Sequence, residues 1–442
     1  MTGTDPSGEQ RREWIERAWA QLDDARLIEL VAGMVGIPSP TGEEGDLARW
    51  LAERLREAGL EGRYQPIDAT QGNAAGRLRG DGSGADLLLY APIDTLTVGT
   101  AEEDVPWIGD ALRPDMRPEA IVDGDYVLGL GASNPKGHGA CVIAAAEAIR
   151  KAAVPLRGEL FVGLGAGGMP TNKRTVPRAQ RYNAGQGNGV SFLLEQGLHP
   201  HFALIAKPGW AVSHDEVGLC WFEVRVRGTF SYVGSRHRMS YRNPIVHAAT
   251  VVQALERWFP QYTARHTEET VAPQGNIGAI EGGWPRMPSV SPALCRLRVD
   301  LRTRPAVTPA QVRAEFRAAI EAIAAEHPEL DLDWDMVLSI PGTATPADSW
   351  IVRAAVEAWQ AIEDRPHVPI AHNSGATDAN ILRGRGVPTA RIGMDRIGPG
   401  APLPLDFPSG MNVVDVREMR RLARHLIHTA VNTCTRTREE LA

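Results

Sequence analysis

The sequence has little of what marks secreted, membrane or nucleic-acid-binding proteins. Only four of its 442 residues are cysteine, and no CxxC pair occurs, so neither a disulfide framework nor a zinc knuckle is indicated. No apolar run reaches the length of a membrane-spanning helix, and the polar N-terminus lacks the apolar core of a signal peptide. The net charge of -7 excludes the basic footprint of a nucleic-acid-binding protein. We expect a cytoplasmic protein without nucleic-acid or membrane partners.

The order of hydrophobic patterns indicates one α/β domain interrupted by a second domain. Apolar strands alternate with helical patterns over residues 1–217 and 341–442, which is typical of a doubly wound, mainly parallel sheet. Residues 218–340 give strand, helix, strand, strand, helix, strand, with alternating apolar and polar residues in the strands. This order predicts a ferredoxin-like α+β domain. At the N-terminus, residues 9–36 carry a helical pattern throughout.

Three polar side chains follow predicted strands or turns of the first domain. The run LLLYAPIDT predicts a buried strand that ends at Asp94, and a glycine-rich turn containing Asn134 leads into a helix. In open α/β sheets ligands bind beyond the carboxyl ends of the strands. Asp94 serves there either as general base or nucleophile or as a cap of the following turn, and Asn134 suits a left-handed turn position. Lys207 ends another apolar strand, where a desolvated lysine can hold an anion.

Five short motifs, in this order and spacing, resemble the M20 family of metallo-aminoacylases and carboxypeptidases, which includes acetylornithine and succinyl-diaminopimelate deacylases. The motifs are Ile93-Asp94-Thr95, GASNPKG at 131–137, Asn243 before a helix, Asp300-Leu301-Arg302, and SGATDA at 374–379. The resemblance covers the chain from about residue 27 to residue 433. It implies a catalytic-type domain with a dimerisation domain, and a site with two zinc ions held by His, Asp and Glu, with a further Glu as general base.

Carried over position by position, the resemblance implies that the zinc ligands are replaced. The ligand and general-base positions fall on Pro92, Asn134, Gly167, Gly168, Lys207 and Pro408. Proline and glycine offer no side-chain ligand, and a lysine repels a cation. Asp94, which orients the first histidine in the family, is retained. We therefore expect no zinc or other cofactor, with one alternative, a relocated metal site built from His138, His214 and His372.

Groups on the substrate side of the family's site are retained by the same resemblance. Arg302 and the backbone amides near Gly375 and Thr377 resemble the family's carboxylate-binding groups. Asn243 and His372 are further candidate substrate-binding residues. A small carboxylate-bearing molecule is therefore the expected ligand.

The middle domain carries the expected contact between subunits. Tyr232 falls on the family's histidine that assists the oxyanion, in a region that reaches across a dimer to the substrate. The resemblance thus implies a homodimer formed through this domain. Residues 220–227 are the strand that we expect at its contact edge.

Three hypotheses for the function remain open. In the first, the hydrolase scaffold acts without zinc on an amide or related C–N bond of a small carboxylate. Asp94 and Lys207 then act as acid and base, while Asn134 and Tyr232 donate hydrogen bonds to the oxyanion. In the second, the protein is a non-catalytic ligand-binding or regulatory homologue. In the third, it is a zinc-dependent amidohydrolase or peptidase with relocated ligands.

Overall fold

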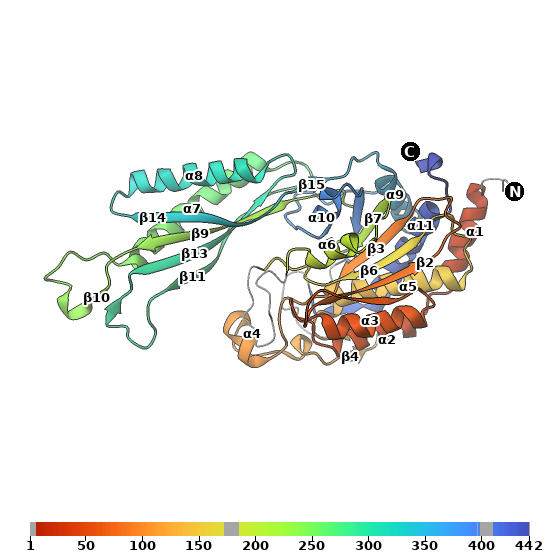
Figure 1. The fold of residues 1–442 in the computed structure, drawn as a ribbon, viewed down its shortest axis with the longest axis horizontal. Coiled ribbons are helices and arrows are strands. Elements are labelled where there is room, and N and C mark those ends of the chain that lie inside the picture. The colour runs from red at the N-terminus through yellow and green to blue at the C-terminus, as the bar shows by residue number, and fades with distance from the viewer. Residues whose placement is uncertain (1–5, 172–184, 396, 398–409, 442) are drawn as a thin grey trace. The chain divides into compact units, whose positions relative to one another are not determined.

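The chain folds into two compact units, each built on its own sheet (Figure 1). The computed structural model describes residues 6–171, 185–395, 397 and 410–441. Unit 1 comprises Met1–His214, Thr345–Ile370 and Thr377–Ala442, and unit 2 comprises Asp215–Ala344 and Ala371–Ala376.

Unit 1 is organised around a six-stranded sheet of order β1-β2-β6-β3-β7-β16. Strands β6, β3, β7 and β16 run parallel, and β1 and β2 complete one side in antiparallel pairing. The bounds are β1 (Arg63–Pro66), β2 (Gly72–Leu78), β3 (Leu87–Pro92), β6 (Leu160–Gly165), β7 (Phe202–Ala206) and β16 (Thr389–Ile392). Every residue of β3 and β6 is buried, as expected of strands covered on both faces. The mainly parallel sheet predicted from the apolar runs is confirmed.

Helices cover this sheet, and a smaller sheet accompanies it. The helices of unit 1 are α1 (Gly8–Trp19), α2 (Asp24–Val35), α3 (Gly45–Glu57), α4 (Ala101–Ile108), α5 (His138–Lys151), α6 (Asn188–Glu195), α9 (Trp350–Glu363), α10 (Ala379–Gly384) and α11 (Val416–Cys434). The smaller sheet, of order β17-β5-β4, consists of β4 (Ile121–Asp123), β5 (Tyr126–Leu128) and β17 (Val413–Asp415). No helix in the described ranges has the length and apolar character needed to cross a bilayer.

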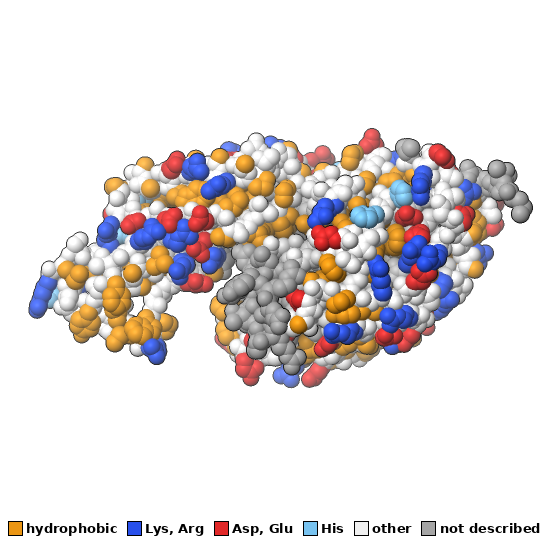
Figure 2. Space-filling model, viewed as in Figure 1, with side chains coloured by type: hydrophobic (Ala, Val, Ile, Leu, Met, Phe, Trp, Pro, Cys, Tyr) orange, Lys and Arg blue, Asp and Glu red, His pale blue; other side chains and the backbone are white. Residues whose placement is uncertain are grey.

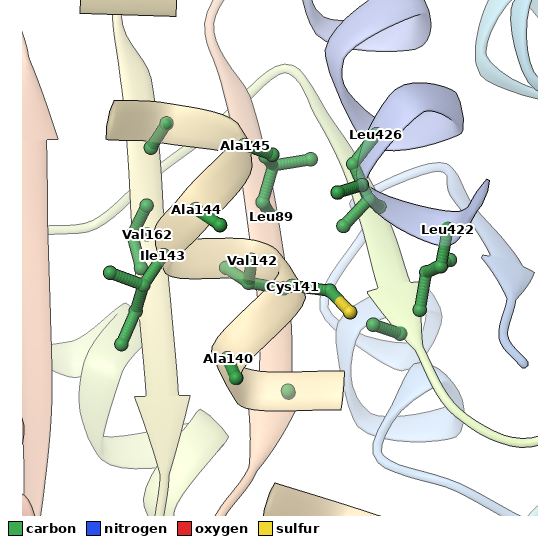
Figure 3. Packing of buried hydrophobic residues seen from close by; sticks show 14 of the residues in the cluster. Leu89, Ala140, Cys141, Val142, Ile143, Ala144, Ala145, Val162, Leu422 and Leu426 are labelled. Atoms are coloured by element: carbon green, nitrogen blue, oxygen red, sulfur yellow. The ribbon is translucent and has the colours of Figure 1, made fainter. Parts of the chain in front are cut away.

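The core of unit 1 is centred on α5, which packs on the sheet and against α11 (Figure 3). Its side chains from His138 to Ile149 are all buried, and most of them are small. Alanines let the helix approach Leu89 of β3 and Leu426 of α11 closely, and burying each leucine contributes roughly 1.5–3 kcal/mol. This packing fixes the turn that precedes α5.

The helix predicted over residues 9–36 is two helices, so that prediction is wrong in its extent. Helix α1 ends at Trp19, and α2 begins at Asp24. Asp23 caps α2 by accepting a hydrogen bond from the backbone N of Ala25 at 3.0 Å. An aspartate in this position stabilises a new helix start, which the apolar periodicity does not reveal.

Unit 2 has an antiparallel sheet of order β11-β13-β9-β14, the ferredoxin-like arrangement expected from the sequence. Helices α7 and α8 pack on one face, where Phe222 of β9 stacks on Phe316 of α8 at 3.9 Å between ring centroids. Acidic and basic side chains alternate and form ion pairs on the strands of this unit (Figure 2). The bounds are β8 (Asp215–Glu216), β9 (Gly218–Arg227), β10 (Ser231–Tyr232), α7 (Pro244–His266), β11 (Gly275–Gly282), β12 (Val290–Ser291), β13 (Leu294–Thr303), α8 (Pro309–Glu326), β14 (Asp331–Ile340) and β15 (Thr343–Ala344).

The strand expected at the contact edge, residues 220–227, lies inside this sheet. It belongs to β9, which pairs with β13 on one side and β14 on the other. Its backbone groups are therefore used within the unit, and that prediction is wrong. The edges are β11 and β14.

Candidate functional site

The loop after β6 is held by side chains from three other segments. Four successive backbone N–H groups, from Ala166 to Met169, each donate to a side-chain oxygen. The acceptors are Asn73 Oδ1 at 3.0 Å, Glu44 Oε1 at 2.9 Å, Asp94 Oδ1 at 2.9 Å and Asp94 Oδ2 at 2.8 Å. The loop containing Gly167 and Gly168, where the family resemblance implies glutamates, is thus anchored by the side chains of Asn73, Glu44 and Asp94.

Asp94 lies at the carboxyl end of β3, as predicted, and is fully buried. Besides the two loop amides, its Oδ2 accepts a hydrogen bond from Thr41 Oγ1 at 2.7 Å. Burial raises the pKa of Asp94, while the Thr41 hydroxyl and the Lys207 ammonium oppose the rise. Both carboxylate oxygens are therefore occupied by contacts that position the loop. A role of Asp94 in acid–base chemistry stays a prediction.

Glu44 is a site residue that the sequence reasoning missed. It is fully buried at the start of α3, and its Oε2 atom has no hydrogen-bond partner in the described part of the chain. Burial and the nearby charge of Asp94 raise the pKa of Glu44 to about 8. Glu44 is therefore mostly protonated at neutral pH. In the sequence nothing separates Glu44 from its neighbour Glu43.

Lys207 and Asn134 meet beside Asp94, so the structure brings these three predicted residues together. Lys207 follows β7, is 7% exposed, and donates from Nζ to Asn134 Oδ1 at 3.3 Å. Asn134 is extended (φ -122°), contrary to the left-handed position expected for it. Gly131 takes the left-handed position instead (φ 73°), because a glycine adopts it without strain.

A small pocket of about 80 Å³ opens beside Asn134. Thr95 and Gly131 contribute to its polar side, and Ile108, Met116 and Leu130 are among its apolar lining. No hydrogen bond is donated by Asn134 Nδ2 to any described residue. The pocket thus offers an amide donor, oriented by Lys207, next to an apolar wall.

The residues present do not fit a two-zinc site. A Cβ at Gly168 would lie 2.6 Å from Pro92 Cβ and 3.1 Å from Asp94 Oδ1, so an acidic side chain has no room there. Lys207 places a cation at a further ligand position, and Pro408 lies outside the described residues. In the ranges that the structure describes, no group of three or more His, Cys, Asp or Glu side chains could hold a metal ion.

The three histidines of the relocated site likewise form no such group within the described residues. The ring of His138 is fully buried and bonded at both nitrogens, to Ser133 O at 2.8 Å and from Met394 N at 3.2 Å. Burial lowers its pKa to about 3, so the ring is neutral. His214 Nδ1 contacts Thr345 O at 2.9 Å, and His372 belongs to unit 2.

Most predicted substrate-binding residues lie in unit 2. Tyr232 on β10 is 59% exposed. Asn243 caps α7 by accepting from Ile245 N at 3.0 Å, and Arg302 donates to Asp300 Oδ2 at 2.8 Å. These contacts are local. Substrate binding by Asn243 and Arg302, and donation to an oxyanion by Tyr232, stay predictions.

The turn after residue 370 is divided between the units. His372 (φ 55°) and Gly375 belong to unit 2, and Gly375 N donates to Asn373 Oδ1 at 3.0 Å. Thr377 belongs to unit 1, where its Oγ1 accepts from Ala379 N at 3.2 Å. Their roles toward a substrate stay predictions.

Comparison with known proteins supports the fold. Residues 215–328 match the family model of the M20 peptidase dimerisation domain. This part of the chain is thus similar to the dimerisation domain of M20 peptidases. The chain is 25% identical over 309 residues to the N-formyl-4-amino-5-aminomethyl-2-methylpyrimidine deformylase of Bacillus subtilis, an alignment spanning 66% of each chain.

Two further proteins match over more of the chain. A succinyl-diaminopimelate desuccinylase of Methylobacterium is 25% identical over 378 residues, covering 80% of this chain and 85% of that protein. The solved structure of the dipeptidase Dug1p from Saccharomyces cerevisiae shares the fold, with a TM-score of 0.69 and 12% identity over 94% of this chain and 98% of that one. The chain therefore has an M20 hydrolase-like scaffold.

Proposed function

We propose that this M20-type scaffold binds a small carboxylate-bearing molecule at Asn134 and Lys207 without zinc. The observation that carries the proposal is the contact of Lys207 Nζ with Asn134 Oδ1 at 3.3 Å. By the family resemblance, Lys207 stands where M20 enzymes have an acidic zinc ligand. The ammonium fixes the amide so that Nδ2 is directed away from it, and it adds positive charge where an anion would sit. The adjoining pocket of about 80 Å³ suits the small acyl or alkyl part of such a molecule.

A binding role accords better with the contacts of Asp94 than a catalytic one does. A general base needs a lone pair within reach of the substrate proton. Both oxygens of Asp94 already accept hydrogen bonds from Thr41, Gly168 and Met169. The non-catalytic alternative raised by the sequence is therefore our first candidate.

Metal-independent hydrolysis of an amide C–N bond is the second candidate, and Glu44 favours it. A carboxyl group with a pKa of about 8 can retain a proton for transfer at neutral pH. In this scheme Asp94 and Lys207 move the proton, and Asn134 donates to the developing oxyanion. Tyr232 of unit 2 remains the further donor that the family resemblance suggests.

A matched pair of probes tests both candidates. N-acetylglycine carries a carboxylate and an amide, whereas N-acetylglycinamide lacks the carboxylate. Calorimetric titration should detect binding of the acid alone, and Lys207→Met should abolish it. Lys151→Met, at an exposed lysine that pairs with Glu147, serves as control.

Three outcomes separate the candidates. Equal binding of both probes, or unchanged binding by Lys207→Met, would contradict the proposal. Release of acetate in the presence of EDTA, lost in Lys207→Met, would favour hydrolysis. Binding without release would favour the non-catalytic role.

We also infer a homodimer formed through unit 2, on the strength of its match to a dimerisation domain. Hydrophobic side chains gather at the end of this unit that carries β10 (Figure 2). Ile280 on the edge strand β11 is 56% exposed. Sedimentation should give a dimer that Ile280→Glu dissociates, whereas Val337→Glu on the other edge strand, β14, should leave it intact. A cytoplasmic location is a further proposal, supported by four free cysteines.

A further inference from the structure

Large apolar side chains are exposed mainly at the end of unit 2 that carries β10. Nine of the fifteen exposed large hydrophobic residues in the described ranges lie in two segments, residues 228–247 and 278–292. Pairing of β10 with β12 joins the segments, with Tyr232 opposite Val290, and we call their common surface the tip. Hydrophobic and basic side chains gather there (Figure 2). Proteins rarely expose so many apolar side chains together except at an interaction site.

The tip is also basic, although the whole chain has a net charge of -7. Four of its arginines are exposed: Arg236, Arg238, Arg242 and Arg286. None of the four forms an ion pair within the described residues, and Arg236 lies over the ring of Tyr241 at 4.7 Å instead. Glu281 is the one acidic residue in the two segments. On the sheet of the same unit, by contrast, Arg225 pairs with three carboxylates.

The composition of the tip is that of a protein–protein interface. Arginine, tryptophan, tyrosine, phenylalanine and methionine are enriched in such interfaces, and lysine is depleted. The tip exposes Phe230, Tyr232, Trp284 and two methionines, and its two segments contain no lysine. Its partner must carry negative charge. A second tip does not qualify, because equivalent residues meet at a twofold axis and the arginines would repel one another.

Residues 96–125 of unit 1 form a second exposed surface with apolar side chains. Trp107 on α4 is 86% exposed, and Leu96 is 62% exposed. Leu96 and Ile108 line the same pocket, so Leu96 lies near the end of α4 that carries Trp107. An exposed tryptophan beside an exposed leucine suits the apolar part of the tip.

The charge of this second surface is opposite to that of the tip. The segment contains eight acidic and two basic residues. Four of the acids are exposed and form no ion pair within the described residues: Glu102, Asp110, Glu119 and Asp123. Of the two arginines, Arg113 is paired with Asp115 at 2.7 Å, which leaves Arg117 exposed. The chain thus presents one basic and one acidic surface, each with exposed aromatic side chains.

We propose that the tip of one copy docks on residues 96–125 of a second copy. The inference rests on the homodimer proposed above and assigns the surfaces that meet in it. The arginines of the tip face the carboxylates of the partner, and the exposed aromatic side chains of both surfaces are buried together. A twofold pair contains this contact twice, since each copy offers a tip and an acidic surface.

Two double charge reversals test the contact by sedimentation of the full chain. The tip variant carries Arg238→Glu and Arg242→Glu, and the loop variant carries Glu102→Arg and Asp110→Arg. All four positions are exposed, so folding should be unaffected. In each variant alone like charges face one another, and the dimer dissociation constant should rise about tenfold or more.

Mixing the two variants in equal amounts should restore a dimer. The reversed tip then meets the reversed loop, and the second contact joins a natural tip to a natural loop. Recovery on mixing requires a contact between copies, because charge reversal in separate chains cannot repair a contact within one chain. Arg257→Glu with Arg317→Glu, at exposed positions of α7 and α8, is the control and should dimerise as wild type does.

The outcomes separate this inference from the proposed homodimer. Equal dimerisation of wild type and both reversed variants would overturn the docking and leave the homodimer intact. Weakened variants that mixing does not restore would likewise overturn it. A wild-type monomer at micromolar concentration would remove both proposals. Wild-type monomer that binds phosphatidylserine vesicles, with binding lost in the tip variant, would assign the tip to a membrane instead.

Discussion

Replacing Glu44 by glutamine should remove a loss of unfolding free energy that wild type shows as the pH rises. The pKa of Glu44 lies at about 8 in the folded chain, against an ordinary 4.5. Between these values the folded chain holds a proton that the unfolded chain releases. Its contribution to stability is fully present below about pH 4.5 and is lost as the pH rises through about 8. At about 1.4 kcal/mol per pH unit, wild type should lose roughly 2–3 kcal/mol from pH 6 to pH 9 through this group.

Glu44→Gln keeps an oxygen for the amides of Gly42 and Gly167 and cannot ionise. Urea unfolding followed by tryptophan fluorescence at pH 6, 7, 8 and 9 would measure the difference between variant and wild type. We expect this difference to move in favour of the variant as the pH rises. For Glu43→Gln, at the partly exposed neighbouring residue, the free energy of unfolding should change with pH as it does in wild type. If the free energy of unfolding of Glu44→Gln had the same pH dependence as that of wild type, the conclusion that Glu44 is protonated in the folded chain would be wrong.

Three further predictions concern the same unit and the buried thiols. Thr41→Val should destabilise the chain by about 1.5–3 kcal/mol in urea unfolding, because Asp94 loses a charge-assisted hydrogen bond, and Thr41→Ser should restore it; equal stability of the two variants would argue against this. Gly168→Ala should cost about 1–3 kcal/mol through the clash with Pro92, and a double-mutant cycle with Pro92→Gly should show coupling, whereas additive effects would exclude the clash. All four cysteines are buried, and burial raises their pKa values, so a colorimetric thiol reagent should react only after denaturation; rapid reaction of the native protein would contradict their burial.

The sheet was predictable from the sequence because its strands are apolar on both faces. The runs that became β3 and β6 have no alternation, and only a sheet covered on both sides buries them fully. Periodicity could not reveal the break before Asp23, since Leu22 and Leu27 continue the buried pattern across it. Nor does alternation show whether a strand lies inside a sheet or at its edge. The interior position of β9 follows only from its observed pairing with β13 and β14.

The site was predictable as far as strand ends determine it. Asp94 and Lys207 follow neighbouring parallel strands, and the turn with Asn134 feeds the helix packed on them, so their meeting follows from the fold. Glu44 could not be found in this way, because its partner Gly167 is 123 residues away along the chain. The hydrogen bonds that both oxygens of Asp94 accept come from Thr41 and the loop amides, and the sequence spacing does not reveal the orientation of these donors.

Zinc titration tests the central claim most directly. Protein purified without chelator would be analysed for metal content by mass spectrometry and then titrated with zinc by calorimetry. The contacts of Pro92, Gly168 and Lys207 predict no tightly bound zinc and no change in the binding of N-acetylglycine when zinc is added. About two tightly bound zinc ions per chain, as a two-metal hydrolase site requires, would contradict the account.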